Sequence, residues 1–126
     1  MSLQVIATEN APSAIGPYSQ AVVSNGMLYA SGQIPLDSKS GEIVPGGISA
    51  QTKQVLDNLK AVVEASGASM SQVVKVTIYI VDMAQFAVVN EIYGSYFSAP
   101  FPARACVQVS ALPKGVEVEM DAIVQL

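Results

Sequence analysis

The sequence predicts an α+β fold, a single mixed β-sheet with two helices packed on one face. Three observations predict it: runs rich in β-branched residues at both ends of the chain, two segments of helical periodicity between them, and a further strand-like run that separates these two segments. The expected order of elements is therefore β-β-β-α-β-α-β-β. A length of 126 residues suits one domain, so we expect residues 1–126 to form it.

The first third of the chain has the pattern of strands and turns. Residues 5–7 form a short apolar run, and residues 19–23 and 27–32 predict a hairpin. The Asn-Gly pair at 25–26 supports the hairpin, because both residues tolerate the positive φ angles of a tight turn. Residues 35–47 contain two prolines and three glycines, which indicates a loop with at most one short strand.

Two helices are expected around a central strand. Apolar residues over 48–66 recur at the spacing of one helical face, and Gly67 follows where a helix commonly ends. The β-branched run 73–81 predicts the strand. Asp82 then has the spacing of a helix cap with a glutamine three residues on, so we expect a second helix that runs to about Phe97.

The chain ends in two predicted strands, 104–110 and 116–124. Alternation in the second strand places its valines toward the helices and Glu119 on the helix-free face. The same reasoning in the first strand turns Ala105, Val107 and Val109 toward the helices, which would put Arg104 and Cys106 on the helix-free face with Glu119. A sheet face of this mixed character is often covered by a neighbouring subunit. The 51% hydrophobic and 13% charged content points the same way.

Charge and composition exclude several classes of function. The net charge is −4 and the six basic residues are scattered, so we expect no nucleic-acid partner. The chain has no histidine and one cysteine, which excludes His-based catalysis, Cys/His zinc sites and an intrachain disulfide. The first five residues lack a signal-peptide pattern, and no apolar run is long enough to span a membrane. A cytoplasmic protein is therefore expected.

Arg104 is the first candidate for chemistry, because it is the only arginine, follows Pro102-Ala103 and opens a strand. A planar, permanently charged guanidinium suits a carboxylate ligand. The alternative is a solvated arginine or an ion pair with Glu119 or Asp121. Glu119 itself would position or deprotonate a water molecule if burial raised its pKa, and would otherwise be an ordinary exposed glutamate.

Two further residues have both a functional and a structural interpretation. Cys106 would need a source of thiolate stabilisation to act as a nucleophile, and with no histidine present, packing as a small apolar side chain is favoured. Tyr18 lies in the rigid stretch Gly16–Gln20, where its ring would form either the wall of a pocket or ordinary loop packing.

Four stretches, in this order and spacing, resemble the RidA/YjgF family of enamine/imine deaminases along nearly the whole chain. They are residues 16–21 (GPYSQA), residues 31–35 (SGQIP), Val89-Asn90, and residues 102–120 with PAR at one end and VEM at the other. The resemblance implies a chorismate-mutase-like fold in which the last strand lies next to the third. It also implies a homotrimer with its sites between subunits.

The same resemblance implies hydrolysis of 2-iminoacids and 2-enamines to 2-ketoacids and ammonia, with no cofactor. Arg104 would hold the substrate carboxylate, Glu119 would orient water and transfer protons, and other residues would complete the site: Tyr18, Ser31 and Asn90 as lining, with backbone N–H groups near Gly32 and Cys106. Two alternatives stay open. One is a binding module for 2-ketoacids without turnover, and the other, ribonuclease activity, is disfavoured by the acidic charge and the lack of histidine.

Overall fold

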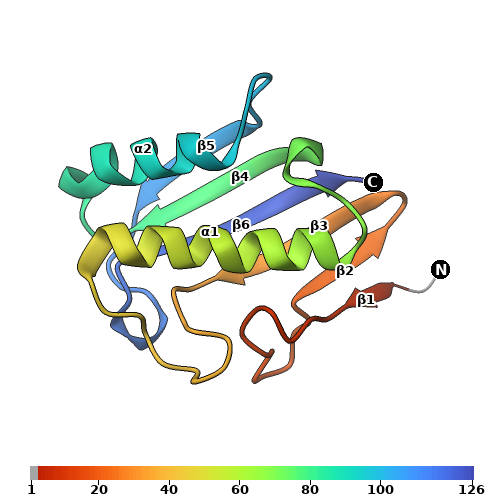
Figure 1. Ribbon diagram of the computed structural model, residues 1–126, viewed down its shortest axis with the longest axis horizontal. Coiled ribbons are helices and arrows are strands. Elements are labelled where there is room, and N and C mark those ends of the chain that lie inside the picture. The colour runs from red at the N-terminus through yellow and green to blue at the C-terminus, as the bar shows by residue number, and fades with distance from the viewer. Residues whose placement is uncertain (1–2) are drawn as a thin grey trace.

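The protein, seen in a computed structural model that describes residues 3–126, has the predicted order of elements (Figure 1). Met1 and Ser2, the start of the stretch without a signal pattern, lie outside the described residues. The elements are β1 (Gln4–Ile6), β2 (Ala21–Ser24), β3 (Met27–Gln33), α1 (Gly47–Ala65), β4 (Val73–Ile80), α2 (Phe86–Tyr96), β5 (Ala103–Gln108) and β6 (Val118–Gln125). None of the helices in the described part of the chain is long and apolar enough to cross a membrane.

The six strands form one mixed sheet in the order β1-β2-β3-β6-β4-β5. The last strand, β6, lies between β3 and β4 and is antiparallel to both, as the family resemblance implies. The β4 and β5 strands are parallel because α2 carries the chain back along the sheet between them. This leaves β1 and β5 as the two edges.

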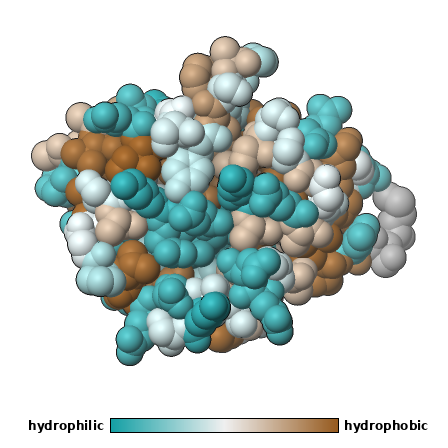
Figure 2. All heavy atoms as spheres, viewed as in Figure 1, coloured by the Kyte–Doolittle hydropathy of each residue, from teal (hydrophilic) through white to brown (hydrophobic). Residues whose placement is uncertain are grey.

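Both helices lie on the same face of the sheet, so the predicted fold class is confirmed (Figure 1). α1 contributes five aliphatic side chains that are fully buried: Val55, Leu56, Leu59, Val62 and Val63. Burying each one stabilises the fold by about 1.5–3 kcal/mol. The outer surface of this layer is mainly hydrophilic along α1 (Figure 2).

Helix starts and turns agree with the sequence patterns in most places. Asn25 and Gly26 both have positive φ, as the tight turn requires, and Gly67 ends α1 with φ of +88°. Asp82 caps a short 3₁₀ turn instead of the α-helix itself: its carboxylate accepts a hydrogen bond from the backbone N–H of Ala84 at 3.0 Å. α2 therefore begins only at Phe86.

The predicted faces of β5 are wrong. β5 runs parallel to β4 in a register that puts Arg104 beside Val76 and Cys106 beside Ile78. Residues paired in register point to the same face, and Val76 and Ile78 are fully buried under the helices. Arg104 and Cys106 therefore face α2, while Val107 points away. Alternation misleads here because β5 is an edge strand whose residues, except for a partly buried Cys106, are all exposed.

The prediction for β6 is confirmed, and the two results together separate the main candidates. Val118 and Met120 are fully buried on the helix side, so Glu119, between them, lies on the helix-free face. Arg104 and Glu119 thus occupy opposite faces of one sheet. The helix-free face also exposes apolar side chains, including Val5 (60% exposed), Tyr29 (45%) and Val107 (43%).

Candidate active site

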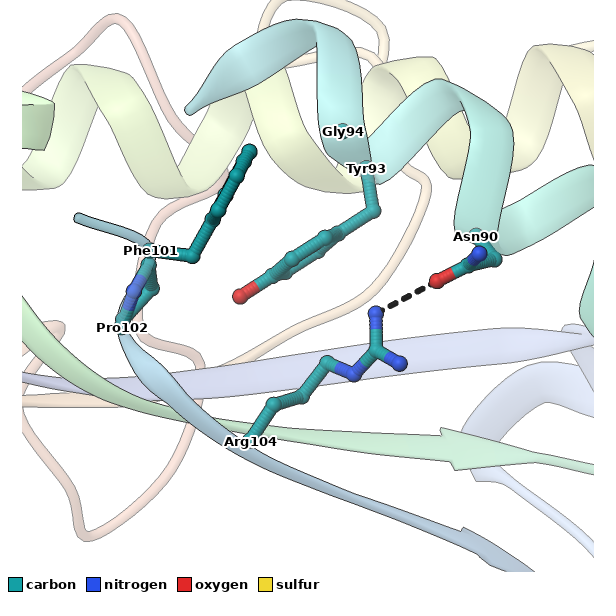
Figure 3. A pocket seen from close by; sticks show the side chains of 6 residues that line it. All are labelled: Asn90, Tyr93, Gly94, Phe101, Pro102 and Arg104. Carbon is teal, nitrogen blue, oxygen red and sulfur yellow. Dashed lines mark hydrogen bonds between the residues drawn. The ribbon is translucent and has the colours of Figure 1, made fainter. Parts of the chain in front are cut away.

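Arg104 lies in a hollow of ≈ 440 Å³ between α2 and β5 (Figure 3). The hollow is lined by residues of both elements and of the loop that joins them: Asn90, Tyr93, Gly94, Phe101, Pro102 and Arg104. The guanidinium donates a hydrogen bond from Nη1 to Asn90 Oδ1 at 2.6 Å. It also lies over two aromatic rings, 5.3 Å from the centre of Phe86 and 5.0 Å from that of Tyr93.

These contacts come from one face of α2. Phe86, Asn90 and Tyr93 are spaced i, i+4 and i+7, so they project from the same side of the helix toward β5. Asn90 was expected only through the family resemblance, and neither ring was predicted from the sequence. Their helical spacing from Asn90 was the signal that could have identified them.

The charge of Arg104 has no acidic partner among residues 3–126. Its one side-chain hydrogen bond is to a neutral amide. The ion pairs considered from the sequence do not form: Glu119 and Asp121 lie on the opposite face, and Asp121 accepts a hydrogen bond from the Tyr79 hydroxyl at 2.9 Å. The guanidinium is therefore held in place by neutral groups while its charge stays available to an anion.

Tyr93 supports the arginine with its ring and not with its hydroxyl. The side chain is 4% exposed, and its hydroxyl has no hydrogen-bond partner within the described residues. Figure 3 shows that hydroxyl directed toward Phe101 and Pro102. Burial raises the pKa of Tyr93, and the nearby Arg104 charge only partly offsets this, so the phenol stays neutral.

Cys106 lies two residues along the same face of β5 and packs against the core. Burial raises the pKa of its thiol, although the charge of Arg104 acts in the opposite direction. A raised pKa favours the thiol over the nucleophilic thiolate. The structure therefore supports the packing interpretation of Cys106.

Glu119 lies in a second hollow of ≈ 300 Å³, which also contains Tyr18 and Gly32. The other lining residues come from three loops and the end of β3: Pro12, Ser13, Ile15, Gln33, Ile34, Leu36, Pro113 and Lys114. β3 is irregular here, since three steps from Ala30 to Gln33 oppose only two steps of β6. Such a bulge redirects the backbone beside the carboxylate. The hollow thus brings together three of the predicted site residues.

Gly32 has a steric reason to be glycine. A Cβ at this position would overlap the carboxylate of Glu119, which lies directly across the glycine backbone. The Glu119 side chain is partly buried by this arrangement. Burial raises the pKa of Glu119, and the negative charge of Asp121 raises it further. A carboxyl group of this kind is suited to exchanging protons.

Ser31 holds a loop in place. Its hydroxyl donates to the carbonyl oxygen of Ser19 at 2.6 Å, and its backbone N–H donates to the carbonyl oxygen of Gln20 at 2.9 Å. Both bonds tie β3 to the segment that carries Tyr18. In this chain, Ser31 therefore supports the wall of the Glu119 hollow.

The predicted site residues thus form two groups that a single chain does not unite. Arg104, Asn90 and Cys106 are on the helix side at the edge strand β5, whereas Tyr18, Gly32 and Glu119 form the second hollow. Within residues 3–126, no three His, Cys, Asp or Glu side chains gather in a way that could hold a metal ion.

The fold and these two hollows define a small α+β protein with an arginine held by neutral groups and a separate, partly buried carboxyl group of raised pKa. A family model described as Endoribonuclease L-PSP matches residues 8–126. A RutC family protein of Pyrococcus horikoshii is 55% identical over 120 residues, 95% of each chain. The 2-iminobutanoate/2-iminopropanoate deaminase of Mus musculus is 51% identical over 120 residues, 95% of this chain and 88% of that protein.

A crystal structure of RidA from an Antarctic Psychrobacter has a TM-score of 0.94 at 46% identity, covering 98% of this chain and 99% of that one. The chain therefore belongs to the family described as Endoribonuclease L-PSP, which includes RidA/YjgF, and the resemblance found in the sequence is confirmed.

Proposed function

We propose that this protein is a hydrolase that deaminates 2-iminoacids and their 2-enamine tautomers to 2-ketoacids and ammonia. The observation that carries the proposal is the setting of Arg104, whose guanidinium is fixed by an amide and two rings and is paired with no carboxylate among residues 3–126. The deaminase name of a relative 51% identical along nearly the whole chain supports the same activity.

The reaction needs little catalytic equipment. Water adds to the electrophilic imine carbon, and the carbinolamine formed then breaks its C–N bond to release ammonia and leave the ketone. An enamine first gains a proton at its terminal carbon and loses one from its nitrogen, which converts it to the imine tautomer. No electrons are transferred to or from the substrate, and no cofactor enters the balance.

Arg104 binds the substrate carboxylate and so fixes the orientation of the imine carbon. The fork of a guanidinium suits this task better than the single charge of a lysine, because it can donate two parallel hydrogen bonds. Asn90 keeps the fork in place from one side. The rings of Tyr93 and Phe86 lie against it on the side of α2.

Glu119 orients the attacking water and transfers its protons. Its pKa is raised by burial and by the negative charge of Asp121, which makes the protonated form more accessible than in an exposed glutamate. Tyr18 and Gly32 border the same hollow and would enclose the substrate beside it. Backbone N–H groups near Gly32 and Cys106 would add hydrogen bonds, and Ser31 keeps the loop of Tyr18 in position.

We further propose that the working unit is a homotrimer in which one chain supplies Arg104 and the next supplies Glu119. The two halves of the site lie on opposite faces of a single sheet, so one copy cannot use both on one substrate. The apolar side chains on the helix-free face, Val5, Tyr29 and Val107, give a second copy a surface to cover.

The family description names an endoribonuclease, but the composition of this chain favours a small carboxylate over RNA. A net charge of −4 and scattered basic residues offer no surface for a phosphate backbone. We place the reaction in the cytoplasm, in keeping with a single cysteine that remains a free thiol.

The test couples the protein to a threonine dehydratase with threonine and follows the loss of the imine absorbance. Wild type should accelerate the loss. Arg104→Ala should lower kcat/KM at least about a hundredfold, because the guanidinium is the main anchor of the carboxylate. Lys60→Ala, which removes a positive charge from α1, is the matched control and should behave as wild type. Equal rates for wild type and Arg104→Ala would contradict the anchoring role.

The non-catalytic binding module is distinguished with Glu119→Gln. If the protein is an enzyme, this variant should still bind a 2-ketoacid in a calorimetric titration and yet lose about a hundredfold in kcat. Binding of the 2-ketoacid by a wild type that shows no turnover would favour the binding module instead.

A further inference from the structure

Gln20 is a buried amide whose side-chain hydrogen bonds all go to the backbone of one loop. The side chain is 4% exposed. Its Oε1 accepts from the backbone N–H of Thr8 at 2.7 Å. Its Nε2 donates to three backbone carbonyl oxygens, those of Thr8 at 3.1 Å, Ala11 at 3.3 Å and Pro12 at 2.7 Å.

The loop between β1 and β2 has few other bonds of its own. Inside it, Tyr18 N–H donates to the Gly16 carbonyl and Asn10 N–H donates to the Thr8 hydroxyl. Buried backbone groups need partners, and in an irregular segment no neighbouring strand supplies them. For residues 8–12, the Gln20 side chain supplies the hydrogen-bond partners that a neighbouring strand would otherwise provide.

Gln20 also connects this loop to the rigid part of the Glu119 hollow. Its backbone carbonyl accepts a hydrogen bond from the N–H of Ser31 at 2.9 Å, and Ser31 directly precedes Gly32. On the other side of the connection, the loop contributes Pro12, Ser13, Ile15 and Tyr18 to the lining of the hollow. Gln20 thus connects the loop that lines the Glu119 hollow to the bulge of β3, which borders the same hollow.

We propose that Gln20 is a positioning residue for the deaminase site, holding the loop of residues 8–18 in its substrate-ready position. The inference rests on the proposed function. Without the amide the loop becomes mobile, and each substrate molecule must then order it on binding. That cost weakens ground-state and transition-state binding equally, so it raises KM and leaves kcat nearly unchanged.

The test compares Gln20→Met with Thr52→Val by steady-state kinetics on the imines that a dehydratase makes from serine and from threonine. Methionine has the length of glutamine and none of its hydrogen bonds, so KM should rise about tenfold while kcat stays within about twofold. Thr52 is fully buried and donates its hydroxyl to the Ile48 carbonyl within α1. Its valine variant loses a buried hydrogen bond far from the loop, and KM should not change.

Gln20→Glu serves if the methionine variant does not fold. A carboxyl group at this position can still accept from Thr8 N–H but has at most one proton to donate to the three carbonyl oxygens, so a rise in KM is again expected. Hydrogen exchange gives a readout that needs no turnover: amides of residues 8–18 should exchange at least about tenfold faster in either variant and unchanged in Thr52→Val. A folded variant with wild-type KM, or with wild-type exchange in the loop, would overturn the role of Gln20.

These outcomes separate the two proposals. Absence of deaminase activity in wild type would contradict the proposed function, and the exchange measurement would still decide whether Gln20 fixes the loop. Full activity in wild type together with an unchanged KM in Gln20→Met would leave the function standing and remove only the positioning role.

Discussion

The two hollows of this protein have opposite effects on the charged group that each contains. Around Arg104, a neutral amide and two rings hold a permanent positive charge without neutralising it. Around Glu119, burial and a neighbouring negative charge make the ionised form less stable. The first environment suits binding of an anion, and the second suits proton exchange. This small sheet provides both environments by placing Arg104 and Glu119 on opposite faces.

A substitution in the β3 bulge beside Glu119 should cause the largest loss of activity. Gly32→Ala should lower kcat/KM about a hundredfold, because its Cβ overlaps the carboxylate and must displace it. The effect should act through Glu119, so in a Glu119→Ala background the same change should cost almost nothing. Additive losses in this double-mutant cycle, measured by steady-state kinetics, would show that Gly32 acts by another route.

Changes to the Tyr93 ring, which lies against Arg104, should have a smaller effect on kcat/KM, and two variants separate the ring from its hydroxyl. Tyr93→Leu removes a cation–π contact worth about 0.5–1 kcal/mol and should lower kcat/KM about twofold to fivefold. Tyr93→Phe keeps the ring and removes a hydroxyl that has no partner among the described residues, so activity and thermal stability should stay at wild-type level or better. A large loss in Tyr93→Phe would assign the hydroxyl a role in the reaction.

The smallest expected change is a shift in the pH dependence of kcat/KM that depends on Glu119. If ionised Glu119 accepts the proton, kcat/KM rises with pH as this group ionises, and its raised pKa moves that rise to higher pH. Asp121→Asn removes the negative neighbour but can still accept from the Tyr79 hydroxyl. Ionisation then becomes easier, so the acid limb should move to lower pH. A limb that stays in place or moves upward would contradict the assignment.

Sequence patterns predicted the elements, the fold class and the faces of β6 because those features depend on burial. Residues 118–124 point alternately into the buried core and toward the less covered face, so their apolar and polar side chains alternate in the sequence. β5 has no such contrast, since it is an exposed edge strand, and its orientation is set by the register with β4 instead. That register is a tertiary property, which explains why Arg104 was assigned to the wrong face.

The site was predictable in its members and not in its arrangement. The positions of Arg104, Glu119 and Tyr18 made them candidates from the sequence itself, and the family resemblance added Ser31, Gly32 and Asn90. Gln20 lies in one of the stretches that carry the family resemblance, but its role was not predicted, because a buried glutamine and a solvated one look alike in a sequence. Separation of the members into two hollows also depends on which face each strand presents, and so required the structure.

Complementation between two inactive variants tests the central claim, that Arg104 and Glu119 of different chains form each site. Arg104→Ala and Glu119→Ala chains are mixed in equal amounts, unfolded, refolded together and assayed on the dehydratase-generated imine. Each variant refolded alone, and the double variant refolded with each, serve as controls. Random assembly should restore about one quarter of wild-type activity, since one site in four receives both intact residues. Activity no higher than that of the separate variants, from mixed oligomers shown to form, would contradict the account.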